Sequence, residues 1–154
     1  MTWQNNGTPT AERSTGMYFE EMAAGQAATF TKTVTEADIV LFAGVSGDTN
    51  PVHLDAEYAA GTMFKSRIAH GMLSASFIST VIGTKLPGPG VIYVGQNLKF
   101  KAPVRIGDTV TARVEVTGLV AEKKFVTLKT QCLVGGKVVI DGDATVMVPS
   151  RGAQ

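Results

Sequence analysis

The chain has 154 residues, of which fourteen are basic and thirteen acidic, so its formal net charge at pH 7 is +1. This length suits one domain that can bury a core without help from a disulfide or a metal ion. The basic residues are spread along the sequence and form no stripe, which argues against proteins that bind nucleic acids or membrane surfaces.

The N-terminal residues 1–17 lack the basic region followed by an apolar region that marks a secretory signal peptide. We predict a flexible leader there and a single domain over residues 18–150. Cys132 is the only cysteine, which excludes a disulfide within the chain and favours a reducing compartment. The longest uncharged stretch, residues 68–84, is shorter than the ~20 residues of a membrane-spanning helix. These features predict a cytoplasmic protein.

The first half of the chain predicts a strand and short helices. Residues 27–34 are rich in threonine, which favours a strand. Thr35 and Asp38 then stand at the spacing of a capping box, so a helix should begin there and end at Gly47. Turn-forming residues follow, and residues 54–64 predict a helical turn or two and then a loop.

The middle of the chain predicts one apolar helix, and the rest predicts strands. Residues 71–83 carry small or apolar side chains at nearly every position, as in a helix that is enclosed on all sides. Period-two patterning then begins, with a two-residue glycine turn between the last two segments. The four segments are residues 91–104, 108–120, 123–134 and 137–149.

Helical segments followed by strands, without strict alternation, argue for an α+β fold with an antiparallel sheet. A sheet wrapped around one apolar helix accounts for both halves of the chain. The pattern contains no repeat and no linker, so one layer of sheet and one main helix are expected.

The segment FAGVSGDTNPVHLDAEYA, residues 42–59, places Asp48 five positions before His53, with a proline-stiffened turn between them. An unperturbed aspartate is ionised at neutral pH and an unperturbed histidine is mostly neutral. Either could therefore accept a proton from a shared water and return it. In the other interpretation, Asp48 caps backbone amides of the turn and His53 is an ordinary polar residue of a loop. On the pattern alone, this second interpretation is the commoner one.

His70 and Gly71 begin the apolar helix, where free amide N–H groups attract developing negative charge. An oxyanion site is one interpretation; in the other, Gly71 allows a tight entry into the helix and His70 packs or faces solvent. Ser76 and Ser79 fall on one face of this helix, where serines usually bond back to a carbonyl.

The sequence shows no Ser-His-Asp order and no Cys-His pair suited to acyl-enzyme chemistry. Its two histidines lie seventeen positions apart, which makes a poor set of metal ligands. We therefore predict a reaction without a metal ion and without a covalent intermediate.

Three segments, FAGVSGDTNPVHLD, AHGMLSASF and GQNLKFKAPVRIGDTV, closely resemble the R-specific enoyl-CoA hydratases of the MaoC-like dehydratase family. The resemblance runs from about Tyr18 to Pro149 and shows no departure at the key positions. It implies the hot-dog fold, an antiparallel β-sheet wrapped around a long central helix. It also implies a homodimer or a higher homo-oligomer.

Carried over by position, the resemblance makes Asp48 and His53 the catalytic acid–base pair and the Gly71 amide the oxyanion donor. It places Ser79 by the reacting centre and gives Asn50 the task of bracing the loop. The implied reaction is the reversible hydration of trans-2-enoyl-CoA to (R)-3-hydroxyacyl-CoA, with no cofactor.

Other activities on this fold remain alternatives, since hot-dog proteins also include acyl-CoA thioesterases and acyl-carrier-protein dehydratases. A non-catalytic acyl-CoA-binding subunit is the alternative from a different class. The presence of both Asp48 and His53 argues against that last role. Fatty-acid β-oxidation and the supply of polyhydroxyalkanoate precursors are two pathways that would use the hydratase reaction.

Overall fold

The structure is a computed structural model, and it describes residues 16–152. Of the predicted leader, only Gly16 and Met17 lie within this range, and the Met17 amide donates to the Pro87 carbonyl at 2.8 Å. Residues 1–15 of the predicted leader lie outside the described residues. The elements in chain order are η1 (Phe19–Glu21), β1 (Ala27–Thr33), α1 (Glu36–Ser46), α2 (Pro51–Leu54), α3 (Ala56–Ala60), α4 (Gly71–Thr84), β2 (Ile92–Phe100), β3 (Thr109–Val120), β4 (Phe125–Val134) and β5 (Lys137–Met147).

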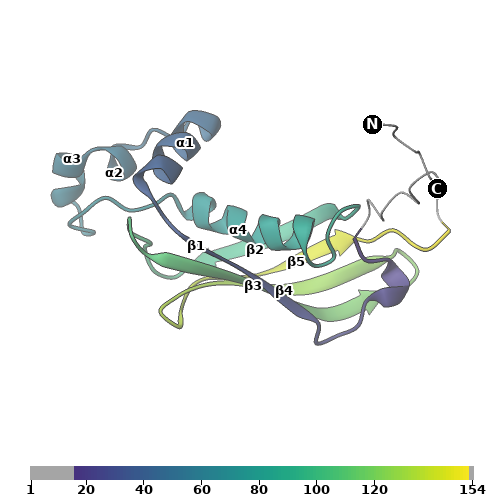
Figure 1. Ribbon diagram of the computed structural model, residues 1–154. Helices are drawn as coiled ribbons and strands as arrows, with labels where there is room; N and C mark the ends of the chain where they lie inside the picture. Colours follow the sequence, from purple (N-terminus) through teal and green to yellow (C-terminus); the bar gives the residue numbers. More distant parts are fainter. Residues whose placement is uncertain (1–15, 153–154) are drawn as a thin grey trace, which may run out of the picture.

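The five strands form one antiparallel sheet in the order β1-β3-β4-β5-β2. The sheet is curved, and α4 lies along one face of it, against β3, β1 and β4 (Figure 1). Helices α1, α2 and α3 gather beside the start of α4 (Figure 1). The predicted α+β class and the sheet wrapped around a central helix are confirmed.

The core lies between the sheet and α4. Successive side chains of a strand point to opposite faces, and on β3 the inward set is Val110, Ala112, Val114 and Val116, each at most 1% exposed. Ile78 of α4 belongs to the same buried cluster. Burying an aliphatic side chain of this size contributes roughly 1.5–3 kcal/mol, so this layer fixes the position of α4.

The turns and caps form as the residue pattern predicts. Thr35 Oγ1 accepts from the Asp38 amide at 3.2 Å, and Asp38 Oδ2 accepts from the Thr35 amide at 2.9 Å, which starts α1. Gly135 and Gly136 have φ values of 56° and 80°. Two central residues with positive φ are what a type I′ hairpin turn requires, and β4 pairs with β5 across it. The predicted hairpin is confirmed.

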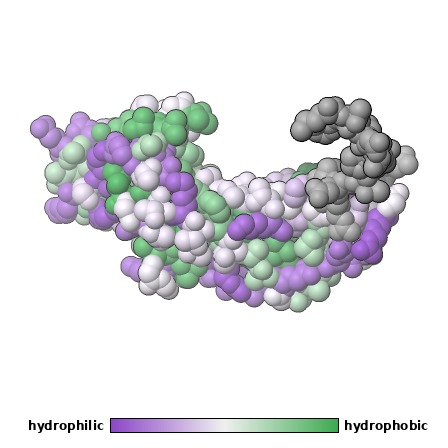
Figure 2. Space-filling model, in the orientation of Figure 1, coloured by the Kyte–Doolittle hydropathy of each residue, from purple (hydrophilic) through white to green (hydrophobic). Residues whose placement is uncertain are grey.

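The expectation that α4 is enclosed on every side is wrong for the single chain. The curved sheet covers only one side of the helix, so Met72 is 55% exposed, and Ser76 and Ser79 are also exposed. Large apolar side chains are exposed on α1 as well, where they form an apolar patch on the surface (Figure 2). None of the helices in the described range is long and apolar enough to span a membrane.

Cys132 lies in the core and is fully buried. Its thiol donates to the Ser74 carbonyl at 3.4 Å, and burial raises its pKa to about 12. The thiol therefore stays protonated at neutral pH and does not act as a nucleophile. Cys132 fills the core, as the sequence predicts.

Candidate active site

The loop between α1 and α2 is shaped by its own side chains. Gly47 ends α1 in the left-handed region, with φ 79°. Asp48 Oδ1 then accepts from the Asn50 amide at 3.2 Å, and Asn50 Oδ1 accepts from the Val52 amide at 3.2 Å as the N-cap of α2. Pro51 occupies the first turn of that helix. The carboxylate of Asp48 thus caps a turn amide with one of its two oxygens, and Asn50 caps α2; that Asn50 braces the loop for the reaction stays a prediction.

His53 is held in one tautomer by a buried contact. Its side chain is 8% exposed, and Nδ1 lies 2.8 Å from the Ile68 carbonyl oxygen. A carbonyl oxygen only accepts, so Nδ1 carries the hydrogen, and Nε2 of the neutral ring keeps a free lone pair. Arg67 Nε donates to the His53 carbonyl at 2.6 Å, while its guanidinium holds both oxygens of Glu36 at 2.8 and 3.0 Å. Arg67 thus links His53 of α2 to Glu36 of α1, and its bond to Glu36 is bidentate.

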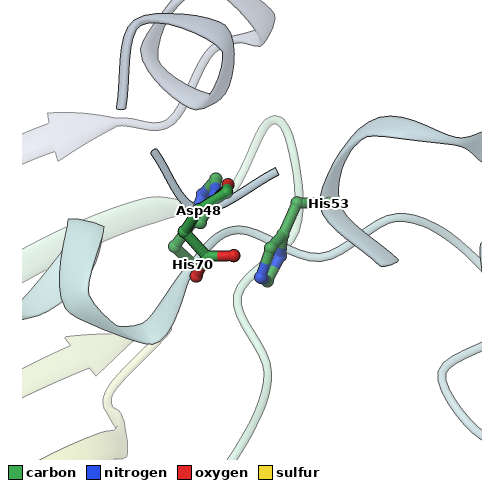
Figure 3. A group of neighbouring side chains, drawn as sticks. All are labelled: Asp48, His53 and His70. Atoms are coloured by element: carbon green, nitrogen blue, oxygen red, sulfur yellow. Dashed lines mark hydrogen bonds between the residues drawn. The ribbon is translucent and has the colours of Figure 1, made fainter. Parts of the chain in front are cut away.

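The structure brings the predicted acid–base pair together. One oxygen of Asp48, one ring nitrogen of His53 and one of His70 all lie within 4.8 Å of one another (Figure 3). At this separation a single water molecule can hydrogen bond to both Asp48 and His53. Asp48 is exposed and His53 is buried, so the group lies at the boundary between the protein surface and the interior.

His70 is the member of this group that sequence reasoning missed. It is 2% exposed, its Nε2 lies 2.9 Å from the Asp48 carbonyl oxygen, and its ring stacks on His53 with centroids 3.8 Å apart. Its Nδ1 is buried without a hydrogen-bond partner among the described residues. The ring of Phe42 lies against it at 4.8 Å. His70 therefore packs, and it does not face solvent.

Two histidines and a carboxylate are also a set that binds divalent transition metals. His53 and His70 are seventeen positions apart in the sequence, but the fold brings their rings to a centroid distance of 3.8 Å. The two rings are nearly parallel, with an interplanar angle of 28°. One nitrogen of each ring faces a backbone carbonyl oxygen, Nδ1 of His53 at Ile68 and Nε2 of His70 at Asp48, so these two nitrogens donate and do not bind an ion in this arrangement. A reaction without metal stays a prediction.

Gly71 begins α4 and lines a cavity of about 520 Å³. Asp48, His70 and Gly71 line this cavity, and most of its remaining wall is apolar. The amide of a first helical residue has no partner within the helix, and the Gly71 N–H has no hydrogen-bond acceptor among the described residues. A Cβ at Gly71 would lie 2.7 Å from two ring carbons of Phe100, so any side chain there would require this exposed ring to shift. The apolar wall includes Met63, Phe64, Ile68, Met72, Phe100 and Ile140.

Ser79 lies apart from this cavity in the single chain. It is exposed, and it follows Gly71 by eight helical residues, about 12 Å along the axis. The serine that does line the cavity is Ser74, which is 1% exposed and whose Oγ has no hydrogen-bond partner among the described residues. The helical period could have drawn attention to Ser74, since it lies one turn beyond His70. The role of Ser79 beside the reacting centre stays a prediction.

Comparisons with known proteins agree on one family. The family described as MaoC like domain matches residues 20–139. The chain is 70% identical over 135 residues to the (R)-specific enoyl-CoA hydratase of Rhodospirillum rubrum, covering 88% of this chain and 94% of that protein. It is 47% identical over 135 residues to the 3-hydroxybutyryl-CoA dehydratase of Methylorubrum extorquens, covering 88% and 86%.

A solved structure of a related protein has the same fold. The (R)-hydratase from A. caviae involved in PHA biosynthesis superposes with a TM-score of 0.82 at 46% identity. The match covers 84% of this chain and 99% of that one. The central helix and the curved sheet are therefore shared with a solved hydratase.

Proposed function

Since this chain belongs to the MaoC like domain family, we propose that it is a hydro-lyase which hydrates trans-2-enoyl-CoA to (R)-3-hydroxyacyl-CoA and catalyses the reverse dehydration. The family resemblance predicted from the three sequence segments is confirmed. The observation that carries the proposal is that Asp48 and His53 lie within reach of one water, beside a cavity that Asp48 and Gly71 line.

In the proposed mechanism, Asp48 and His53 hold a water against C3 of the enoyl group. The tautomer of His53 leaves Nε2 as an acceptor, which supports His53 as the group that takes the proton of the water. As the oxygen adds at C3, the C2–C3 electron pair shifts toward the thioester carbonyl, and an enolate forms. A proton then returns to C2 on the same face, so the net addition is one molecule of water.

The Gly71 amide would stabilise the enolate oxygen. Negative charge on that oxygen is greater in the transition state than in the bound substrate, so a preorganised N–H lowers the barrier more than it strengthens binding. The position of Gly71 at the start of α4, on the wall of the cavity, supports this role.

Crotonyl-CoA is expected to give (R)-3-hydroxybutyryl-CoA, because the water and the returning proton act from one side of a fixed acyl chain. Loss of the enoyl-thioester absorbance follows the reaction, and chiral chromatography of the product assigns the enantiomer. Release of free CoA would indicate a thioesterase instead. The (S) product would contradict the proposed geometry, and strong preference for an acyl-carrier-protein thioester would favour the acyl-carrier-protein dehydratase.

We also propose a homodimer formed through β2. This strand is an edge of the sheet, and its Ile92 and Val94 are 53% and 50% exposed. An unpaired apolar edge invites a second copy, and most homo-oligomers are closed by a two-fold axis.

Light scattering is expected to give twice the mass of the 16.2 kDa chain at micromolar concentration. Val94→Lys should shift the protein toward the monomer, because it puts a charge on the proposed interface. Leu119→Lys on β3 is the matched control, since Leu119 is 42% exposed away from β2. A monomeric wild-type protein would contradict the proposal.

The metabolic setting follows from the proposed reaction. The A. caviae relative is described as involved in PHA biosynthesis, and supply of (R)-3-hydroxyacyl-CoA for such a polymer is the use that we propose here. A cytoplasmic location stays a prediction.

A further inference from the structure

We infer that His70 is a positioning residue for the proposed hydration: it holds the loop of Asp48, the ring of His53 and the peptide that carries the Gly71 amide in one arrangement. This inference rests on the proposed function. It adds a residue that transfers no proton but sets where the proton-transfer groups lie. Three contacts support it.

The first contact fixes the loop of Asp48. The other hydrogen bonds of residues 47–50 join them to positions no more than four residues away. Within the described chain, the hydrogen bond from His70 Nε2 to the Asp48 carbonyl, 2.9 Å long, is the one that anchors this loop to a distant segment. Without it, the loop that carries the Asp48 carboxylate would keep only its hydrogen bonds between near neighbours.

The second contact fixes the ring of His53. One edge of this ring is bound at Nδ1 by the Ile68 carbonyl, at 2.8 Å. That bond alone leaves the ring free to tilt about the line from Nδ1 to the oxygen. The ring of His70 lies on its face at a centroid distance of 3.8 Å, which removes this freedom. The lone pair at His53 Nε2 then has a defined direction.

The third contact is covalent. His70 is the N-cap of α4, with φ −59° and ψ 134°, and its carbonyl shares one peptide plane with the Gly71 N–H. The imidazole that anchors the Asp48 loop therefore belongs to the residue that sets the direction of the proposed oxyanion donor. A change in the packing of His70 would therefore move both the Asp48 loop and the proposed oxyanion donor.

His70 itself is not arranged to donate a proton. The Asp48 carbonyl only accepts, so Nε2 of His70 carries the hydrogen and is engaged. In the neutral ring, Nδ1 then has no hydrogen to donate, and it faces no partner among the described residues. Its proposed role is to keep the Asp48 loop and the ring of His53 in place.

Three substitutions separate the functions of the His70 side chain. His70→Gln can place an amide N–H near the position of Nε2 and so keep the bond to Asp48. His70→Asn is too short for that bond, and His70→Phe keeps the stacked ring but has no donor. We expect kcat for crotonyl-CoA to fall by roughly 10- to 100-fold in the Asn and Phe variants, the effect of misplaced reacting groups, with KM little changed. The Gln variant should recover most of the loss.

Thermal melts accompany the kinetics, and imidazole ¹⁵N–¹H spectra of the wild-type protein test the geometry without reference to activity. These spectra should show hydrogen on Nδ1 of His53 and on Nε2 of His70. The inference is overturned if the folded Asn and Phe variants turn over like the wild type, if Gln is as impaired as Asn, or if His70 carries its hydrogen on Nδ1. A wild-type protein with the expected tautomers that hydrates no enoyl-CoA would instead overturn the proposed function.

Discussion

Asp48→Asn and His53→Gln are each expected to lower kcat for crotonyl-CoA by about 10²–10⁴ while the protein stays folded, the usual loss for an acid–base group. Asparagine keeps an oxygen that can accept from the Asn50 amide, so the turn survives and only the charge is removed. Glutamine at position 53 removes the lone pair of the imidazole Nε2.

His53→Asn adds a sharper version of this experiment. Its amide can donate to the Ile68 carbonyl, as Nδ1 of the histidine does at 2.8 Å, yet it has no group in the place of Nε2. A large loss in this variant would assign the effect to Nε2 and not to the anchoring bond.

Asp55→Asn is the matched control for the charge of Asp48. Asp55 caps α3, where its Oδ1 accepts from the Tyr58 amide at 3.0 Å, and it also lies close in sequence to the site. The control should retain turnover, with circular dichroism confirming the fold of each variant. If folded Asp48→Asn also turned over at the wild-type rate, Asp48 would be left with its turn-capping role alone.

Gly71→Pro is expected to lower kcat by about 10²–10³, the cost of one lost oxyanion donor, while α4 still begins in place. Proline suits the first residue of a helix because its fixed φ is helical and that N–H has no intrahelical partner. It also requires an extended residue before it, and His70 has ψ 134°. The substitution therefore removes the N–H with little other change to the backbone.

Gly71→Ala keeps the amide, but it is not a neutral control on its own. Its Cβ would lie 2.7 Å from the Phe100 ring, and the proline ring would meet the same obstacle. Phe100 is 53% exposed, so both substitutions are best compared in a Phe100→Ala background, where the obstacle is absent. Equal turnover of folded Pro and Ala variants in this background would show that another group stabilises the enolate.

Local signals in the sequence determined most of the secondary structure. The capping box at Thr35 and Asp38, the left-handed Gly47 and the glycine pair of the hairpin each act through bonds between near neighbours, so the pattern alone was enough. Asp48 and His53 could be paired for the same reason, because they lie in one loop.

Features that depend on distant segments could not be predicted in this way. His70 is next to Gly71 in the chain, but its bond to the Asp48 carbonyl exists only because the start of α4 packs against the loop after α1. Burial of α4 was overestimated because composition reports how apolar a helix is and not what covers it. Ser74 lines the cavity because its side of α4 meets the wall, which the sequence pattern does not show.

The order of the strands also determines when this site can be completed during synthesis. β2 is translated well before β5, yet within the described part of the chain β5 is the strand that pairs with it. During synthesis from the N-terminus, residues 48–71 are therefore available before β5. Until β5 is made, β2 lacks its partner strand, and Phe100 at the end of β2 is not fixed over Gly71. A nascent chain that stops at Val134 would carry every residue of the proposed acid–base group and still lack the support for one wall of the cavity. β5, which emerges from the ribosome after β2, is thus the strand that finishes the site.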